Sequence, residues 1–385
     1  MKIQVLFLLT FSFTTILFAA VPSGYYSTAT GSGATLKTQL YNIIRNHTAL
    51  SYDDLWTAFQ TTDAKANGKV WDMYSDVPGG TPPYEYTFGS AQCGNYSNEG
   101  DCFNREHSMP ASWFSDAAPM YTDLFHLYPT DGYVNNRRGS FPFGEVGTVT
   151  YTSLNGSKVG ASNYPGYSGT VFEPIDEYKG DFARTYFYMA TRYENVISTW
   201  YSNSTEANAV LQNNTFPVFE TSFLNMLAEW HVQDPVSAKE TARNDAVYAL
   251  QGNRNPYIDN PQYVYSVWGV GATGPSEPQS HVSNFSARNI RLQWTDATGA
   301  NLPDSYLIRM STTGFNDIVV PQDGTAYPDS ETDRNIAYGV QEVWFKNLQP
   351  ATTYYFKIFG YTGSGNSCNY KTEGDIPQIS KFINE

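Results

Sequence analysis

Basic residues are scarce in this chain of 385 residues. Lys and Arg number 23 against 37 Asp and Glu, so the formal net charge is −14 and the pI is about 4.8. Because nucleic acid attracts proteins through Lys and Arg, this charge argues against nonspecific binding to a polyanion. It does not exclude a local basic cleft, and a net negative charge also favours solubility outside the cell.

Long apolar runs are missing except at the start of the chain. Lys2 precedes VLFLLTFSFTTILFAA, which ends in small residues at Ala19 and Ala20. This run carries several hydroxyls and falls short of the ~20 apolar residues that a membrane span needs. Residues 1–20 are therefore predicted to be a cleavable signal peptide. The mature chain is expected to be soluble, secreted or periplasmic, without a membrane span, and divided into two domains.

Cysteine is also scarce, with Cys93, Cys102 and Cys368. Cys93 and Cys102 bracket the short loop CGNYSNEGDC and suit a local disulfide in an oxidising compartment. Closing such a loop stabilises the fold by roughly 2–3 kcal/mol in the chain-entropy model. Metal-ligand cysteines are the alternative, but no second Cys or His pair stands at zinc-finger spacing. Cys368 is expected to be a lone thiol.

Aromatic residues are abundant instead, with 30 Tyr, 23 Phe and 8 Trp. The chain from residue 21 to about 268 mixes helical and irregular segments, and its stretch 75–167 is rich in Gly, Pro, Asn and Tyr, as functional loops are. Apolar spacing and breakers predict helices in this part. They cover 34–47, 180–198 (largely buried), 219–234 and 237–252, with a break at Pro235 and an end at Gly252.

The last third of the chain has a different texture. Residues 269–279 are rich in Gly, Pro and Ser and read as a linker. Strand-like runs with turn residues between them follow over 280–373 and predict a β-sandwich. This part resembles a fibronectin type III module, in which Trp294 follows the early alternation and LQPATTY leads into a tyrosine corner at Tyr354. Residues 374–385 are predicted to be a C-terminal tail.

One of only five histidines stands beside a carboxylate, in DCFNREHSMPASWF. His107 can act as a general base because the unperturbed pKa of His is about 6.5, and Glu106 is a hard oxygen ligand for a divalent cation. Adjacent side chains of a strand point to opposite faces, but in a bend before Pro110 both could border one cleft. Alone, the dipeptide is more typical of a surface Glu beside a partly buried His.

The segment LFHLYPTDGYVNNRRGSF runs from apolar residues into a helix start, with Thr130 or Asp131 as the N-cap. Asn135 then lies in or near the first turn, followed by Arg137 and Arg138. An amide oxygen is a good hard ligand, and guanidinium groups neutralise phosphate. A strand with Glu and His, then a helix with Asn and Arg, is the layout of a one-metal phosphodiesterase. Alone, NNRR would be a solvated helix face.

Residues from about 34 to 268 resemble the bacterial endonuclease I family, secreted or periplasmic nucleases of the ββα-metal or His-Me finger class. The motifs appear in the family's order: CGNYSNEGDCFNREHSMPASWF, TDLFHLYPTDGYVNNRRG, KGDFARTYFYMATRYE, LAEWHVQDPVSAKETARNDAVYALQGNRNPYIDNPQYV and Trp268. The resemblance implies an α+β fold. A mainly helical nuclease domain around a ββα-metal core, over 21–268, is expected to precede the all-β fibronectin-like sandwich.

Roles follow from this resemblance position by position. His107 takes the place of the general base that activates water. Glu106 and Asn135 take the places of the ligands of one divalent cation, Mg²⁺ first, with Ca²⁺ or Mn²⁺ as alternatives. Arg138 stands where the family has an arginine near the metal helix and is predicted to contact phosphate.

The remaining arginine assignments are left as alternatives. Some relatives carry an arginine between the His motif and the metal helix, but SWFSDAAPMYTD has none, so that role is unfilled or taken by Arg137, Arg138 or Arg184. Arg254 either touches the DNA backbone or packs within the fold. Many relatives have two histidines before the Leu of HLYP, and here His126 is expected to be structural rather than a second base.

The implied reaction is metal-dependent endonucleolytic hydrolysis of phosphodiester bonds that leaves 5′-phosphate ends. His107 removes a proton from water, and the water attacks phosphorus in line with the leaving 3′ oxygen while the cation stabilises the developing charge. The partner would be DNA, or RNA as well, read through its backbone with little sequence preference.

Two other functions compete with this one. A secreted adhesion or carbohydrate-binding protein would use the C-terminal module on a surface or polysaccharide and keep the large domain as a scaffold. A metallopeptidase is suggested only by Glu beside His, and the chain has no HExxH. The sequence does not fix the oligomeric state.

Overall fold

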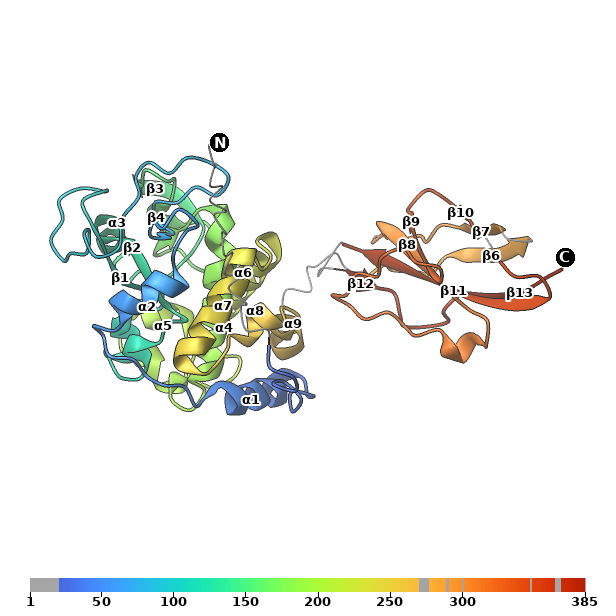
Figure 1. The fold of residues 1–385 in the computed structure, drawn as a ribbon, viewed down its shortest axis with the longest axis horizontal. Helices are drawn as coiled ribbons and strands as arrows, with labels where there is room; N and C mark the ends of the chain where they lie inside the picture. The colour runs from blue at the N-terminus through green and yellow to red at the C-terminus, as the bar shows by residue number, and fades with distance from the viewer. Residues whose placement is uncertain are drawn as a thin grey trace, which may run out of the picture.

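The computed structural model describes residues 21–269, 277–288, 291–299, 301–346, 348–363 and 368–384. The predicted signal peptide at 1–20 and most of the predicted linker at 269–279 lie outside these residues. Within them, no helix has the length and hydrophobicity to cross a bilayer. The described chain forms two units, each with its own core: a mainly helical N-terminal unit and an all-β C-terminal unit (Figure 1).

The helices of the N-terminal unit come before, between and after its strands. They are α1 (Gly33–Ile44), α2 (Leu55–Thr62), α3 (Gly132–Arg138), α4 (Lys179–Arg192), α5 (Thr205–Val210), α6 (Thr221–Gln233), α7 (Ala238–Gln251), α8 (Pro256–Asp259) and α9 (Tyr263–Trp268). Short 3₁₀ turns lie at Ala111–Phe114 (η1), Met120–Thr122 (η2), Asp176–Tyr178 (η3) and Ile197–Ser202 (η4).

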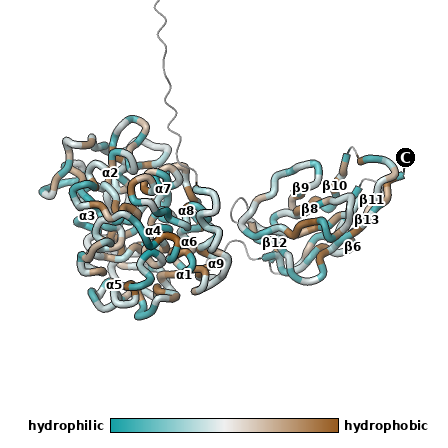
Figure 2. The backbone as a smooth tube through the Cα atoms, turned by 60° about the horizontal axis from the view of Figure 1, so that its bottom comes forward, coloured by the Kyte–Doolittle hydropathy of each residue, from teal (hydrophilic) through white to brown (hydrophobic). Residues whose placement is uncertain are grey.

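The helix α4 is the centre of this unit, and all of its residues are buried. It packs against α6, α1 and α8, and the hydrophobic segments of the unit gather around α6 in Figure 2. The predicted buried helix at 180–198 is thus found, but it ends at Arg192. Beyond that residue the chain turns, so that Glu194 accepts hydrogen bonds from Lys37 and Thr38 of α1.

The pair α6 and α7 confirms the predicted helices at 219–234 and 237–252. Ser237 caps α7 in a capping box with Glu240, in which each side chain accepts from the other residue's backbone N–H. Gly252 ends the helix at a φ of 80°, in the left-handed region that favours glycine.

Two small antiparallel sheets complete the N-terminal unit. The first pairs β1 (Phe103–His107) with β2 (Leu127–Asp131), Glu106 lying opposite Tyr128. The second joins β3 (Val146–Thr152), β4 (Lys158–Ser162) and β5 (Thr170–Glu173) in sequence order. The chain passes directly from β2 into α3, where the Asp131 side chain accepts from Val134 N at 2.8 Å. Asp131 is therefore the N-cap, one of the two residues predicted.

The C-terminal unit is built from two sheets with a core between them. One has the order β10-β7-β6, and the other β12-β11-β8-β9 with β13 also paired to β11. The strands are β6 (Ser283–Arg288), β7 (Arg291–Thr295), β8 (Ser305–Ser311), β9 (Asp333–Ala337), β10 (Glu342–Trp344), β11 (Thr352–Thr362), β12 (Asn369–Tyr370) and β13 (Gln378–Ile383), with a 3₁₀ turn, η5, at Phe315–Asp317.

Local features of this unit fit the expected sandwich, although its fibronectin type III character stays a prediction. The buried Tyr354 accepts a hydrogen bond from the Gln349 N–H at 2.8 Å through its hydroxyl. Residues 374–385 were predicted to be a C-terminal tail, but most of them form β13, which pairs with β11 over six residues of each strand. Ile379 and Ile383 pack against the core, and this burial holds the segment in the sheet.

Candidate active site

The sheet β1–β2 and the helix α3 form a compact ββα unit that carries the predicted site residues. α3 packs against both strands. In β1, alternate side chains point to opposite faces, which puts Asn104 and Glu106 on one face and Arg105 and His107 on the other. Glu106 and His107 both belong to this regular strand, so they do not share a face as they would in a bend.

The face of β1 with Glu106 is turned toward α3. Asn135 donates its amide to Asn104 Oδ1 at 2.8 Å, and Arg138 Nη1 donates to Glu106 Oε1 at 2.9 Å. Asn135 and Arg138 are three residues apart and so lie on one face of the helix. These two contacts, side by side, bring the predicted ligands Glu106 and Asn135 to the same strand–helix seam.

Glu106 is only 2% exposed, and its contacts are concentrated on one oxygen. Oε1 accepts from Arg138 and from the Tyr74 hydroxyl, each at 2.9 Å. Burial raises the pKa of Glu106 to about 7, although Arg138 and the Tyr74 hydroxyl favour its charged form. Among the described residues no group bonds to Oε2, so one carboxylate oxygen is left for another ligand.

The donor set at this seam fits one hard cation. Asn135 is half-buried, and its Oδ1 has no partner in the described chain, while its amide is held by Asn104. A carboxylate oxygen and an amide oxygen are ligands that Mg²⁺ and Ca²⁺ accept, with water completing the shell. The described residues contain no cluster of three or more His, Cys, Asp or Glu side chains suited to a metal. Protein ligands at the seam would therefore be few.

His107 lies on the opposite face of β1, among aromatic rings. Its ring is stacked on Tyr52 at 6.2 Å and tilted toward Tyr121 at 4.8 Å between centroids. Nε2 lies 3.1 Å from the carbonyl oxygen of Tyr121. Because a carbonyl only accepts, Nε2 carries the proton and Nδ1 keeps its lone pair. Burial and the nearby His126 lower the pKa of His107 to about 3, which keeps the imidazole neutral.

Arg138 is buried, 1% exposed, and its guanidinium is occupied by the protein. Besides Glu106 it donates to the carbonyl of His107 at 2.8 Å and to the carbonyl of Ser108. It also lies over the Phe143 ring, 4.8 Å from the centroid. In this structure Arg138 fixes Glu106 and the end of β1, and its predicted phosphate contact stays a prediction.

The other three candidate arginines differ sharply in exposure. Arg137 is exposed at the end of α3, where it donates to the Tyr133 hydroxyl. Arg184 is fully buried and donates through Nε and Nη2 to Glu240, at 2.5 and 2.7 Å. Arg254, 1% exposed, is paired with Asp245 and Asp259. Arg184 and Arg254 therefore tie helices together, and only Arg137 among the three reaches solvent.

Two smaller predictions concern His126 and the cysteines. His126 is buried, with Nε2 2.7 Å from the carbonyl of Met120, the position expected of a structural residue. Cys93 and Cys102 form the predicted disulfide. Cys368 is a free, buried thiol, as predicted.

Sequence reasoning missed three residues that surround the site. Tyr74 supports Glu106, Asn104 holds the Asn135 amide, and Arg105 stands beside His107 on the aromatic face. Alternation along NREH would have placed Asn104 with Glu106 and Arg105 with His107. No local signal ties Tyr74 to Glu106, because they lie 32 residues apart.

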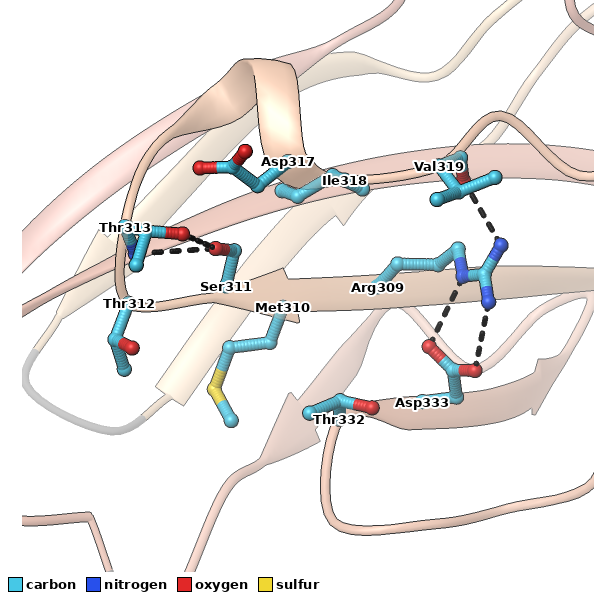
Figure 3. Close-up of a pocket in the computed structure, with 10 residues that line it drawn as sticks. All are labelled: Arg309, Met310, Ser311, Thr312, Thr313, Asp317, Ile318, Val319, Thr332 and Asp333. Carbon is cyan, nitrogen blue, oxygen red and sulfur yellow. Dashed lines mark hydrogen bonds and ion pairs between the residues drawn. The ribbon is translucent and has the colours of Figure 1, made fainter.

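A pocket of about 410 Å³ lies in the C-terminal unit, beside β8 (Figure 3). Its arginine, Arg309, donates to both oxygens of Asp333 at 3.1 Å and to the carbonyl of Val319 at 2.8 Å. The charge of Arg309 is thus neutralised within the unit. The rest of the lining mixes hydroxyl-bearing and apolar side chains and is uncharged apart from Asp317.

The fold and the site together define an α+β protein built on a β-strand pair and helix that present a neutral histidine and hard oxygen ligands. The sequence model of the Endonuclease I family matches residues 32–262. The chain belongs to this family of nucleases. The match covers the N-terminal unit from α1 to α8 and stops before α9 and the C-terminal unit.

Curated relatives agree with this assignment. The chain is 38% identical over 251 residues to an extracellular ribonuclease of Bacillus amyloliquefaciens, covering 63% of this chain and 78% of the relative. It is 36% identical over 250 residues to an extracellular ribonuclease of Bacillus subtilis, with the same coverage. An Endonuclease-1 of Buchnera aphidicola is 28% identical over 180 residues, which is 42% of this chain and 63% of that protein.

Proposed function

We propose that this protein is a secreted, metal-dependent endonuclease that hydrolyses phosphodiester bonds of DNA or RNA with little sequence specificity and leaves 5′-phosphate ends. The observation that carries the proposal is the ββα unit. It has a neutral histidine on one face of β1, and on the other face oxygen atoms of Glu106 and Asn135 that have no partner among the described residues. Membership in the Endonuclease I family supports it.

His107 is the proposed general base. The carbonyl of Tyr121 holds the Nε2–H and thereby aims Nδ1, the nitrogen with a lone pair, away from this bond. Water attacking phosphorus would give its proton to Nδ1, and the new bond would form in line with the leaving 3′ oxygen. Because the rings of Tyr52 and Tyr121 flank the imidazole, its orientation is set before substrate binds.

Glu106 and Asn135 are the proposed ligands of one divalent cation, Mg²⁺ first and Ca²⁺ or Mn²⁺ as alternatives. Such a cation supplies charge stabilisation to the phosphate and to the leaving oxygen. The chain's own contribution is rigidity. Arg138 and Tyr74 fix the carboxylate of Glu106, and Asn104 fixes the amide of Asn135. A preorganised pair of oxygen atoms costs no reorganisation when the substrate binds.

The exposed Arg137 is the proposed phosphate contact among the arginines on α3 and beyond it. Its neighbours Tyr133 and Tyr151 lie with their ring centroids 4.8 and 5.4 Å from the guanidinium carbon. The names of the two Bacillus relatives favour RNA as a substrate, and that of the Buchnera relative does not specify one. The two Bacillus relatives are named as extracellular proteins, which also supports secretion of this chain through the apolar segment at its start.

The C-terminal unit is proposed to be a fibronectin type III-like module that attaches the enzyme to a surface or polysaccharide. Its two packed sheets and the bond between Tyr354 and the Gln349 N–H support the first part of this proposal. The second part is tested by sedimentation of residues 277–385, fused to a fluorescent protein, with insoluble polysaccharides. No binding to any of them would remove the polysaccharide role.

The central experiment uses mature full-length protein, supercoiled plasmid and single-stranded RNA. EDTA should abolish cleavage of both substrates, and Mg²⁺, Mn²⁺ or Ca²⁺ should restore it. His107→Ala should lower the cleavage rate by about 10²–10⁴-fold, the usual contribution of general-base catalysis. His281→Ala, which changes a half-buried histidine of the C-terminal unit, is the matched control. Full activity of His107→Ala, or activity in EDTA, would refute the mechanism.

A further inference from the structure

A second feature of the ββα unit is a solvent-facing pocket of about 500 Å³ that opens beside β1. It is lined by Tyr52, Trp56, Asn104, Arg105 and the segment Gln92–Gly94. The last segment belongs to the loop closed by the disulfide of Cys93. The pocket adjoins both halves of the site, because the Tyr52 ring also stacks on His107 and Asn104 also holds Asn135.

Arg105 is the only cation among the described residues that line the pocket, and its guanidinium lies against aromatic rings. The guanidinium carbon lies 3.4 Å from the centroid of Tyr52 and 4.4 Å from that of Trp56. Nη1 donates to the carbonyl of Tyr52 at 2.7 Å and lies 3.7 Å from the exposed carboxylate of Asp53. The guanidinium also makes a side-chain hydrogen bond to Tyr52, and the Arg105 side chain is 16% exposed.

The remaining lining adds hydrogen-bond donors and no negative charge. The side-chain amides of Gln92 and Asn104 have donor groups without partners in the described chain, and none of the lining residues is acidic. In a chain with a net charge of −14, a concave surface with an arginine and amide donors is suited to an anion. Tyr52 is covered by Arg105 and by His107, so the Trp56 ring is the aromatic surface of the lining that suits a flat, aromatic ligand.

We propose that this pocket is a nucleotide subsite that holds the nucleotide next to the scissile phosphate in a single-stranded segment of the substrate. Arg105 donates to the phosphate of that nucleotide through its remaining N–H groups, and the base packs against the Trp56 ring. This inference rests on the proposed nuclease function and extends it. It predicts a substrate class: strands whose bases are free to leave the stack.

The preference for single strands follows from the shape of the ligand. A nucleobase can pack on an aromatic or guanidinium plane only when it is not stacked between its neighbours, as in loops and single strands of RNA or DNA. In a duplex, the same pocket reaches the sugar–phosphate backbone but not a base face. Arg105 and Trp56 should therefore contribute more to single-stranded than to duplex substrates.

The test measures binding separately from cleavage. His107→Ala protein, in EDTA, is titrated with a fluorescein-labelled single-stranded hexanucleotide and with a labelled duplex of equal length, over a range of salt concentrations. When Arg105→Ala is combined with His107→Ala, single-strand binding should weaken by about tenfold and duplex binding by less than about threefold. It should also reduce the slope of log affinity against log salt by about 0.7, as expected for one lost phosphate contact on a single strand.

Three further variants separate charge, stacking and folding. Arg105→Lys should keep the salt slope and lose part of the affinity, because the charge remains without the planar group. Trp56→Leu should lose single-strand affinity without changing the slope. Arg45→Ala is the matched control, since Arg45 is an exposed arginine over the ring of Tyr41 on α1, and it should change neither quantity.

The subsite would be overturned if the Arg105→Ala protein bound both oligonucleotides with the same affinity and the same salt slope as the Arg45→Ala protein. Equal losses for single strand and duplex would overturn its selectivity. The two proposals fail in different ways. If His107→Ala still cleaves at the native rate while Arg105→Ala loses single-strand binding, the base assignment is wrong and the subsite stands. If no variant binds any oligonucleotide, both are wrong.

Discussion

The two faces of the five-residue strand β1 differ in burial and in charge. On the Glu106 face, charge is buried and neutralised: the carboxylate meets Arg138 and Tyr74, and almost none of it is exposed. On the His107 face, the polar groups are half-buried among rings of Tyr52 and Tyr121 and keep contact with solvent. The Glu106 face favours a carboxylate held in place as a metal ligand. The His107 face favours a neutral base and a surface on which substrate could bind.

The comparison explains how adjacent residues can hold separate roles. A carboxylate beside an imidazole on one face would raise the imidazole pKa and hold its proton. Here the strand keeps the two groups apart, and the first residues to act on the pKa of His107 after burial are His126 and the Tyr121 carbonyl, not Glu106. Substitutions on the two faces should therefore have different signatures.

Glu106→Gln should give the largest effect on cleavage. The amide keeps an oxygen for Arg138 and Tyr74, but the charge that attracts a cation is lost. We expect the rate to fall on the order of a thousandfold and the cation concentration for half-maximal activity to rise, because cation stabilisation amounts to several kcal/mol. Plasmid nicking across a Mg²⁺ titration measures both. An unchanged half-maximal concentration would place the cation elsewhere.

Arg138→Ala should give the largest effect on stability. It leaves the Glu106 carboxylate buried without its ion pair, at a cost of about 3–5 kcal/mol in the free energy of unfolding. Urea unfolding above pH 8, where this carboxyl is charged in the folded protein, measures the loss. Combining Glu106→Gln with Arg138→Met removes both charges and should recover most of the stability without restoring cleavage. If the Arg138→Ala protein were as stable as the native protein, the contacts of Arg138 with Glu106 and the end of β1 would not be needed for folding.

Arg137→Ala should give the smallest effect. The side chain is exposed and lies outside both faces of β1, so stability should not change. One lost phosphate contact should weaken single-strand and duplex binding alike and lower the salt slope by about one for duplex. This uniform loss is the counterpart of the selective loss expected for Arg105→Ala. If Arg137→Ala and Arg105→Ala lowered single-strand binding relative to duplex binding by the same factor, Arg105 in the pocket and Arg137 on the helix would not differ in role.

Local signals in the sequence predicted the local structure well. Ser237 and Gly252 mark the ends of α7, Asp131 caps α3, and the nine-residue spacing of Cys93 and Cys102 matched the disulfide. Each of these depends on residues close in the chain. The C-terminal strand β13 was missed because QISKFI is short, and its place is decided by pairing with β11.

The arginines show why the rest could not be predicted. Arg184 and Arg254 were candidates for phosphate through the family resemblance, with packing as the alternative for Arg254, yet Arg184 pairs with Glu240, 56 residues away. Arg105 was not a candidate, although it is the one stacked on Tyr52, 53 residues upstream. Exposure and pairing of a long side chain depend on contacts between distant segments, which no local pattern encodes.

The position of the ββα unit in the chain also bears on the order of synthesis. Residues 103–138 carry β1, β2 and α3, and leave the ribosome before α4. Yet Tyr186 of α4 donates to the carbonyl of Ser108 at 2.9 Å and lies at hydrogen-bond distance from Arg138. The residues proposed for chemistry are thus made before α4, which is one of the elements that steady them. A nascent chain that stops before α4 should hold every one of these residues and still lack a formed centre.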